Sequence, residues 1–280
     1  VQLALARELH EELGITLFLE DNSKPQLQPL LQIEHDYSDK HVLLDVWQVN
    51  SFQGKPEGRE GQPLRWVLVA ELTNYAFPKA NLAIITACQL SREYVITPEY
   101  ASLAEAKKDI LSIVARHYQQ ILFRQPQLPL QDYQAWLDDL LMTIPGLSTC
   151  LILSGDPVSL SKYKVKGLHM PFRYAVSMQV RPKIEAQYLG VSCHNDLEIR
   201  QAEKINADFI TLSPIQKTDS HPSVQALGWQ AFQGMVKIST LPVYALGGLS
   251  ISDFEQCIKY GAQGIAGITL WRTAGESLSN

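Results

Sequence analysis

Residues 7–15 of the chain read Arg-Glu-Leu-His-Glu-Glu-Leu-Gly-Ile. The surrounding segment, residues 1–13, is rich in leucine, alanine and glutamate, and Gly14 stands where a glycine commonly ends a helix. If this segment is helical, Glu8, Glu11 and Glu12 fall at positions i, i+3 and i+4 and share one face. The stretch therefore predicts a helix that presents three carboxylates together.

Three like charges in such proximity repel one another, so the cluster is costly unless a cation neutralises it. Carboxylate oxygens are hard ligands that suit Mg²⁺ or Mn²⁺, and such ions commonly bridge protein carboxylates to substrate phosphates. A solvated acidic helix face is the alternative interpretation of the same residues. His10 falls elsewhere on this helix, and we expect it to be a surface residue.

The composition bounds the class of protein. The chain has 280 residues, of which 46% are hydrophobic and 19% charged, with a net charge of −5. At roughly 150 residues per domain, this length predicts about two domains, and the composition excludes wholesale disorder. Without a run of lysine or arginine, direct binding of nucleic acid is not expected. Free nucleotides remain compatible with this charge, because a metal ion can supply the positive charge they need.

Cysteine spacing and hydropathy exclude further classes. Cys88, Cys150, Cys193 and Cys257 stand far apart, which argues against a disulfide scaffold and a structural zinc site. No apolar run approaches the roughly 18 residues of a membrane helix, and no signal-peptide pattern opens the chain. We therefore expect a cytoplasmic protein with no membrane partner. The oligomeric state stays open.

Short apolar runs follow the first predicted helix. Residues 30–33, 41–49 and 66–72 alternate with loops that carry glycine, proline and lysine, which predicts three strands. The polar, glycine-rich residues 53–63 predict an exposed loop, and a short helix is expected over residues 81–90.

From Tyr94 onward, strand and helix patterns alternate. The predicted strands cover residues 94–96, 120–123, 150–153, 167–169, 188–192, 209–212, 243–246 and 264–268. The predicted helices cover residues 102–118, 130–143, 196–205, 229–238 and 252–260. Eight short strands favour a (β/α)₈ TIM barrel, with a flavodoxin-like open sheet as the alternative. We expect degenerate helices after the third and fourth strands and a domain boundary between residues 91 and 92.

The order Arg-Glu-hydrophobe-x-Glu-Glu-x-Gly-hydrophobe at residues 7–15 resembles the second half of the Nudix box. This is the signature of enzymes that hydrolyse nucleoside diphosphates linked to another group. The family's box begins with a glycine and a glutamate upstream of this arginine, and those positions would precede Val1. The resemblance implies an α/β/α Nudix domain at residues 1–91 without its N-terminal part. We therefore expect the hydrolysis from the parent protein rather than from these 280 residues alone.

A second stretch is similar to the MutT branch of this family, which removes oxidised guanine nucleotides such as 8-oxo-dGTP. It comprises Glu60-Gly61-Gln62-Pro63, Trp66 and the run Phe77-Pro78-x-Ala80-Asn81. The resemblance implies that Glu60 is a further metal-site carboxylate and that Phe77 and Asn81 lie at the substrate. An Asn amide offers both a donor and an acceptor, so it can read the edge of a purine. Capping of the following helix is the alternative role for Asn81.

The MutT resemblance implies metal-assisted attack of water on a phosphorus of a nucleoside triphosphate, which gives a monophosphate and pyrophosphate. It implies Glu8 as the general base and a metal ligand, Glu11 and Glu12 as metal ligands, and Arg7 as an orienting ion-pair partner. The assignment of the base among such glutamates varies within the family. The implied cofactor is Mg²⁺ or Mn²⁺.

The ends of the last two predicted strands carry phosphate-binding features. Gly247 and Gly248 follow the seventh strand of the predicted barrel, and Thr269 follows the eighth. Barrels that bind phosphate hold it with backbone N–H groups in these two loops, and paired glycines let the backbone approach the anion closely. A tight turn is the alternative explanation of the glycine pair.

Four segments of the second half resemble the thiamine phosphate synthase/TenI family. They read LGVSCH at residues 189–194, ADFITLSP at 207–214, PVYALGG at 242–248 and GAQGIA at 261–266. The resemblance extends over residues 94–272 and implies a site for a phosphorylated small molecule. It implies Arg124, Ser192 and His194 as ligand-site residues, with Thr218 in a threonine-rich substrate loop.

The chain departs from this family where the family binds Mg²⁺ and pyrophosphate. Thiamine phosphate synthases carry Asn-Asp after strand three and Asp after strand four, whereas this chain has Ser154-Gly155-Asp156 and His169-Met170-Pro171-Phe172. Gln125 replaces a family lysine, and Pro214 stands where the TenI branch has a histidine. Because a hydroxyl or glycine cannot replace a carboxylate as a hard-metal ligand of comparable charge, the sequence supports a phosphate-ligand pocket better than condensation of thiamine precursors.

Several functions remain open at this point. The leading hypothesis is a MutT-like pyrophosphohydrolase, active in nucleotide-pool sanitation, fused to a diverged barrel. The alternatives place a thiamine-precursor transferase or isomerase in the barrel, or make the barrel a non-catalytic sensor or assembly module. A non-catalytic module that recognises oxidised guanine is disfavoured, because such a module needs no metal carboxylates.

Overall fold

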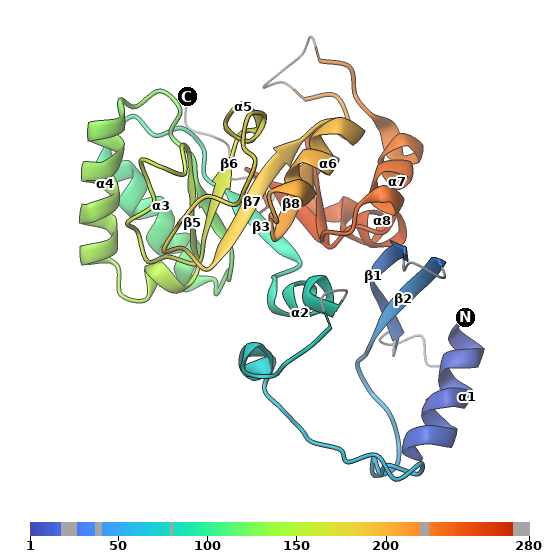
Figure 1. Cartoon of the computed structure of the whole chain (residues 1–280). Coiled ribbons are helices and arrows are strands. Elements are labelled where there is room, and N and C mark those ends of the chain that lie inside the picture. Colours follow the sequence, from blue (N-terminus) through green and yellow to red (C-terminus); the bar gives the residue numbers. More distant parts are fainter. Residues whose placement is uncertain (18–26, 37–40, 79–80, 219–223, 271–280) are drawn as a thin grey trace. The chain divides into compact units, whose positions relative to one another are not determined.

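The computed structural model describes residues 1–17, 27–36, 41–78, 81–218 and 224–270. The chain divides into two compact units, Val1–Gln89 and Leu90–Asn280, which we call the N-terminal unit and the barrel unit (Figure 1). The exact domain boundary between residues 91 and 92 stays a prediction. No helix in the described ranges combines the length and apolar character needed to cross a membrane.

The N-terminal unit is a small sheet with helices. Its elements are α1 (Gln2–Leu13), β1 (Leu27–Asp36), β2 (His41–Val49), the 3₁₀ helix η1 (Val69–Asn74) and α2 (Leu82–Gln89). β1 and β2 pair antiparallel, with Leu27 opposite Val49 and Asp36 opposite His41. Leu30, Leu31 and Ile33 of β1 pack with Ala87 of α2 to form the core of this unit.

The strand expected at residues 66–72 is wrong. Residues 66–68 have no regular structure, and residues 69–74 form η1. The side chains of Trp66 and Leu68 are 79% and 70% exposed, although Trp66 stacks on Phe52 with ring centroids 6.3 Å apart. An apolar run becomes a strand only where a neighbouring strand pairs with it, and the described residues offer none to this segment.

The barrel unit contains eight parallel strands in the closed order β10-β3-β4-β5-β6-β7-β8-β9. They are β3 (Glu93–Ile96), β4 (Ile121–Phe123), β5 (Leu151–Ser154), β6 (Gly167–Met170), β7 (Tyr188–Cys193), β8 (Phe209–Leu212), β9 (Val243–Leu246) and β10 (Gly264–Gly267). Ala266 of β10 lies opposite Tyr94 of β3, so the sheet closes on itself. This closure confirms the predicted TIM barrel and excludes the open flavodoxin-like sheet.

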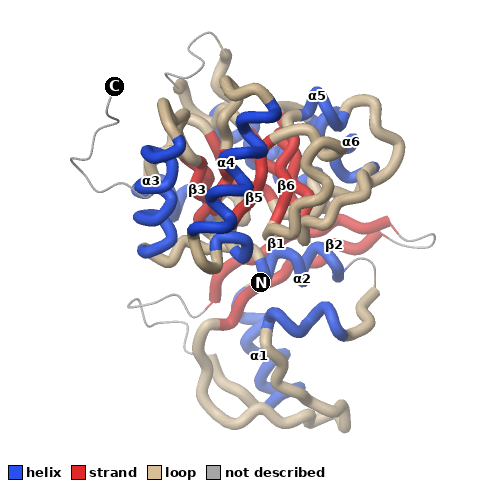
Figure 2. The backbone as a smooth tube through the Cα atoms, turned by 90° about the vertical axis from the view of Figure 1, so that its left-hand side faces the viewer, coloured by secondary structure: helices blue, strands red, loops and turns tan. Residues whose placement is uncertain are grey.

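Helices cover the outside of the barrel (Figure 2). They are α3 (Leu103–Ala115), α4 (Leu130–Thr143), α5 (Phe172–Ala175), α6 (Asp196–Lys204), α7 (Gly228–Ile238) and α8 (Phe254–Lys259), with short 3₁₀ helices η3 (Leu147–Thr149) and η4 (Ile251–Asp253). α3 and α4 lie side by side, and Lys107 of α3 forms an ion pair with Asp139 of α4. The degenerate helices expected after the third and fourth strands are confirmed, because no helix joins β5 to β6 and α5 is a single turn.

Strand alternation divides the barrel into an outer and an inner core. Ile210 and Leu212 of β8 face the helices, whereas Phe209 packs inside the barrel. The inner core is aromatic at its centre: the ring centroids of Tyr94, Phe209 and Tyr244 lie 5.2–5.7 Å apart. Inward side chains that fill the space in layers are what make such a barrel a packed core.

Replacement of Gly190 by alanine should destabilise the barrel. A Cβ there would lie 2.5 Å from Phe209 Cζ and 2.8 Å from His169 Nδ1. Overpacking of this kind costs about 1–3 kcal/mol. We expect urea unfolding, followed by circular dichroism, to show this loss for Gly190→Ala. The matched control is Gly234→Ala in α7, where no atom lies within 4 Å of the added Cβ and alanine favours the helix. Equal stability of the two variants would contradict the tight inner packing.

Candidate functional sites

The loop that contains Glu60 is hydrogen-bonded to the last turn of the carboxylate helix. α1 ends at Gly14, whose φ of 72° is left-handed and whose N–H donates to the His10 carbonyl. Three donors of the loop reach other carbonyls of that turn: Glu57 N–H to Leu13 O at 3.0 Å, Arg59 N–H to Glu12 O at 3.0 Å, and Gln62 Nε2 to Glu12 O at 3.2 Å. The terminal carbonyls of a helix lack partners within the helix, so the loop satisfies them and joins the two motif stretches.

Arg7 holds two of the carboxylates on α1. Its Nη2 lies 2.6 Å from Glu8 Oε1, and its Nε lies 3.9 Å from Glu11 Oε1. The hydrogen bond that Arg7 donates to Glu8 and the negative charges of Glu8 and Glu11 raise the pKa of Arg7 above its usual value. These side chains are exposed, so the ion pairs contribute little to stability but do set the direction of the Glu8 carboxylate.

The four glutamates fit a metal in chemistry but are not assembled around one position. α1 confirms the helix that puts Glu8, Glu11 and Glu12 on one face, and carboxylate oxygens are the ligands that Mg²⁺ takes. In the described part of the chain, however, no three or more His, Cys, Asp or Glu side chains group closely enough to hold a metal ion. α1 has no buried residue, so no packing fixes these side chains.

The two expected substrate-site residues of this unit lie near the start of α2. Asn81 directly precedes α2, is half-buried, and donates its backbone N–H to Pro78 O at 2.9 Å. Phe77 is exposed. The two residues between Pro78 and Asn81 lie outside the described residues.

Two loops at the carboxyl ends of the barrel strands, which we call the barrel mouth, are bound to each other. Ile215 N–H donates to Leu246 O and Gln216 N–H donates to Gly247 O, both at 3.0 Å. Gly247 and Gly248 have φ values of 100° and 71°, and a Cβ on Gly248 would lie 2.4 Å from Lys217 O. Only glycine fits such a close approach of two backbones. The glycine pair therefore lies against the loop that leads to Thr218.

The other expected mouth residues are placed as follows. Thr218 is half-buried, and the residues that follow it, 219–223, lie outside the described residues. Thr269 follows β10 and is exposed. His194 follows β7, and Glu198 accepts hydrogen bonds from both its backbone N–H at 2.8 Å and its Nδ1 at 2.9 Å. His194 is thus held by the first turn of α6.

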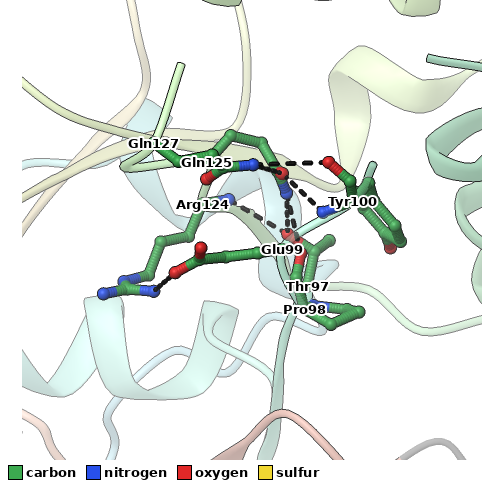
Figure 3. A network of polar contacts seen from close by, with 7 residues as sticks. All are labelled: Thr97, Pro98, Glu99, Tyr100, Arg124, Gln125 and Gln127. Atoms are coloured by element: carbon green, nitrogen blue, oxygen red, sulfur yellow. Dashed lines mark hydrogen bonds and ion pairs between the residues drawn. The ribbon is translucent and has the colours of Figure 1, made fainter. Parts of the chain in front are cut away.

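Arg124 and its neighbour Gln125 belong to a polar network at the ends of β3 and β4 (Figure 3). Arg124 Nη1 lies 3.5 Å from Glu99 Oε1. Gln125 is 3% exposed; its Nε2 donates to Pro98 O at 2.7 Å, and its Oε1 accepts from Tyr100 N–H at 2.9 Å. A buried side chain that both donates and accepts ties the two loops together, which a lysine cannot do because it has no acceptor.

Ser192 ends a line of buried polar groups inside the barrel. Its Oγ lies 2.9 Å from His169 Nε2, and His169 Nδ1 lies 3.1 Å from the Tyr94 hydroxyl. His169 is 3% exposed, and burial lowers the pKa of its imidazole to about 3. The ring is therefore neutral at physiological pH.

Comparison with known sequences identifies both units. Residues 93–270 match the family described as thiamine monophosphate synthase. The chain belongs to this family. Residues 2–87 match a second family, described as the NUDIX domain, so a Nudix domain precedes the thiamine monophosphate synthase domain. Both are families of enzymes that act on phosphorylated small molecules.

Individual relatives each match a part of the chain. A putative thiamine-phosphate synthase 2 of Aquifex aeolicus is 42% identical over 108 residues, which cover 38% of this chain and 56% of the relative. The 8-oxo-dGTP diphosphatase of Escherichia coli is 39% identical over 83 residues, which cover 29% of this chain and 58% of the relative. The chain thus spans little more than half the length of these relatives. A solved structure of a FabK variant from Thermotoga maritima shares the barrel fold, with a TM-score of 0.50 at 12% identity, and covers 69% of this chain and 64% of that one.

Within this thiamine monophosphate synthase domain, the carboxylate of Asp156 accepts hydrogen bonds from the residues of its own turn. Its Oδ1 accepts from Val158 N–H at 3.2 Å, and its Oδ2 accepts from Ser159 N–H at 3.1 Å and from Ser159 Oγ at 2.5 Å. These bonds occupy both oxygens of the one carboxylate that the sequence retains in this region.

Sequence reasoning missed the residues behind the mouth of the thiamine monophosphate synthase domain. His169 stood out only as a departure from the expected carboxylate, and Tyr94 only as the start of a strand. A histidine inside an apolar run was the available signal, since a buried histidine needs hydrogen-bond partners.

The neutral His169 should make the barrel less stable in acid. Its folded-state pKa of about 3 lies below the usual histidine value of 6.5, so the unfolded chain binds the extra proton between these pH values. Stability therefore falls as pH drops through this window, by up to about 1.4 kcal/mol per pH unit. Between pH 7.5 and pH 5, we expect the unfolding free energy of the unmodified protein to fall about 2 kcal/mol more than that of His169→Gln, measured by urea denaturation. Parallel losses in the two proteins would show that His169 is not buried in neutral form.

Proposed function

We propose that the Nudix domain hydrolyses 8-oxo-dGTP to 8-oxo-dGMP and pyrophosphate, which removes an oxidised nucleotide from the precursor pool. The observation that carries this proposal is the set of hydrogen bonds from the Glu60 loop to the last turn of α1. These bonds join the stretch that resembles the Nudix box to the stretch that resembles the MutT branch, and the Escherichia coli relative, 39% identical over 83 residues, is an 8-oxo-dGTP diphosphatase.

Glu8, Glu11, Glu12 and Glu60 are the residues that would hold Mg²⁺ or Mn²⁺. When bound, the metal supplies charge neutralisation at the phosphates and a water of lowered pKa. Glu8 would accept a proton from the attacking water as the water oxygen forms a bond to a phosphorus of the triphosphate, and the phosphorus–oxygen bond that links the monophosphate and pyrophosphate products would break. Arg7, at 2.6 Å from Glu8, directs the carboxylate of this base.

The base of the nucleotide is assigned to Asn81, with Phe77 beside it. An exposed aromatic ring offers a flat apolar surface to a purine, and the Asn amide offers a donor and an acceptor to its edge. The substrate is a free nucleotide rather than nucleic acid, and the net charge of −5 agrees with this choice. A cytoplasmic location belongs to the same proposal.

Glu8→Gln should abolish the hydrolysis. The substitution keeps the size of the side chain but removes the general base, whose contribution is typically about 100- to 10,000-fold. We expect kcat for 8-oxo-dGTP to fall at least about 100-fold in full-length protein with Mg²⁺, measured as pyrophosphate release. Glu71→Gln, on the exposed 3₁₀ helix η1, is the matched control and should retain the unmodified rate. An unmodified rate in Glu8→Gln as well would refute this assignment.

Asn81→Asp separates base recognition from helix capping. Aspartate caps a helix as well as asparagine does, but its carboxylate has no N–H to donate to a purine. If Asn81 reads the guanine edge, KM for 8-oxo-dGTP should rise about tenfold or more while the melting temperature stays unchanged. Kinetics and thermal denaturation of the same protein give both values. Unchanged KM would leave Asn81 with the capping role alone.

A second candidate function belongs to the barrel, and the contact between the Gly247–Gly248 loop and the Thr218 loop favours it. We propose that this mouth binds a phosphorylated small molecule, with thiamine phosphate as the first ligand to test because of the relatives' names. The barrel lacks the metal-binding carboxylates that condensation of thiamine precursors needs, since the carboxylate of Asp156 is hydrogen-bonded to Val158 and Ser159. Calorimetric titration with thiamine phosphate tests the ligand; binding without turnover favours a sensor, and turnover favours a transferase or isomerase.

A further inference from the structure

Three side chains from three strands form a continuous hydrogen-bonded line inside the barrel. The Tyr94 hydroxyl on β3, the His169 ring on β6 and the Ser192 hydroxyl on β7 are joined by contacts of 3.1 and 2.9 Å. Tyr94 is fully buried, His169 nearly so, and Ser192 is half-buried near the carboxyl end of its strand. The line therefore runs from the inner core to the barrel mouth.

The hydrogen-bond partners of Tyr94 fix the direction of the whole line. In the part of the chain that the structure describes, the Tyr94 hydroxyl hydrogen-bonds only to His169 Nδ1. Burial raises the pKa of this phenol well above its usual value, so it keeps its proton, and a buried O–H needs an acceptor. Nδ1 is then the acceptor, and the single proton of the neutral ring lies on Nε2.

It follows that His169 Nε2–H donates to Ser192 Oγ. A hydroxyl that accepts this bond has its own proton free for another partner. Ser192 thus presents a hydrogen-bond donor to the barrel mouth, and the tautomer of the buried His169 ring determines that Ser192 donates rather than accepts there. The His169 ring packs against two aromatic rings, with its centroid 5.9 Å from that of Tyr94 and 5.6 Å from that of Phe209.

A second hydroxyl lies on the neighbouring strand. Thr211 of β8 is opposite Ser192 in the parallel register, and it points into the barrel because it alternates with Ile210 and Leu212, which face the helices. Thr211 is 1% exposed, and its Oγ1 has no hydrogen-bond partner among the described residues. A buried hydroxyl without a partner is uncommon and costs free energy. It marks a place where a ligand atom would complete the bonding.

We propose that Tyr94 and His169 are positioning residues that orient the Ser192 hydroxyl, and that Ser192 and Thr211 together bind an uncharged acceptor group of the barrel ligand. A ring nitrogen, a carbonyl or a hydroxyl has this chemistry. The proposal rests on the mouth binding a phosphorylated small molecule; it assigns the uncharged part of that molecule to the two hydroxyls and its phosphate to the Gly247–Gly248 loop. No charged side chain makes a described hydrogen bond to either hydroxyl, which favours a neutral group there.

Nuclear magnetic resonance of ¹⁵N-histidine-labelled full chain tests the orientation without any ligand. The His169 signals are those lost in His169→Gln. We expect a ring protonated at Nε2 and unprotonated at Nδ1, unchanged between pH 7.5 and pH 5. Tyr94→Phe, which removes one hydroxyl, should shift the ring toward the Nδ1-protonated form. A ring protonated at Nδ1 in the unmodified protein, or one that titrates in this range, would overturn the orientation whatever the binding data show.

Calorimetry with thiamine phosphate as the probe tests the two-hydroxyl site. We expect Thr211→Val and His169→Phe each to weaken binding about tenfold, whereas His169→Gln, whose amide N–H can replace Nε2–H, should stay within about threefold. Thr143→Val, which removes an exposed hydroxyl on α4, is the matched control and should bind as the unmodified protein does. Unmodified protein that binds, with Thr211→Val and His169→Phe binding equally well, would overturn the site. Absence of binding to the unmodified protein would overturn the barrel ligand itself, and the magnetic resonance result would still decide the orientation.

Discussion

The hydrogen bond between the Tyr94 hydroxyl and His169 Nδ1 is the constraint on which the barrel mouth depends. A closed barrel of eight short strands has little interior space, and this one fills it with the rings of Tyr94, Phe209 and Tyr244. A histidine in such surroundings is tolerated only as a neutral ring with both nitrogens bonded. Once Tyr94 donates to His169 Nδ1, the proton of the ring lies on Nε2, which donates to Ser192. The buried residues thereby determine that the Ser192 hydroxyl is a donor at the barrel mouth.

The N-terminal unit solves a comparable problem with backbone groups. A helix ends with carbonyls that lack partners, and the Glu60 loop supplies donors to two of them, those of Glu12 and Leu13. This arrangement joins the residues on either side of Glu60 to the end of α1 while leaving the helix glutamates in solvent. In both units, polar groups that would otherwise lack hydrogen-bond partners are satisfied by other parts of the chain. In the barrel these groups are side chains, and in the N-terminal unit they are backbone carbonyls.

The sequence predicted most of the fold, and the physical reasons for success and failure differ. The barrel strands were predictable because a strand buried on both faces is a short continuous apolar run, as in Phe209–Leu212. The run at residues 66–72 looks the same in sequence, yet no partner strand among the described residues pairs with it. The apolar pattern of a segment indicates which side chains it can bury, whereas its pairing as a strand depends on the rest of the chain.

The sequence predicted which residues belong to the candidate sites, but it did not predict the hydrogen bonds between them. Spacing along α1 placed Glu8, Glu11 and Glu12 on one face, but the link to Glu60 runs through backbone carbonyls, which leave no trace in sequence. Tyr94 and Ser192 reach His169 only through barrel closure and strand register. Thr211 and Gln125 are ordinary polar residues until their burial and partners are known.

A crystal structure of the full-length protein with thiamine phosphate tests the claim that the core sets the chemistry of the mouth most directly. We expect one uncharged acceptor of the ligand within about 3.2 Å of Ser192 Oγ and Thr211 Oγ1, with the phosphate on the Gly247–Gly248 loop. A ligand bound elsewhere, or one that places its phosphate against the two hydroxyls, would contradict the account.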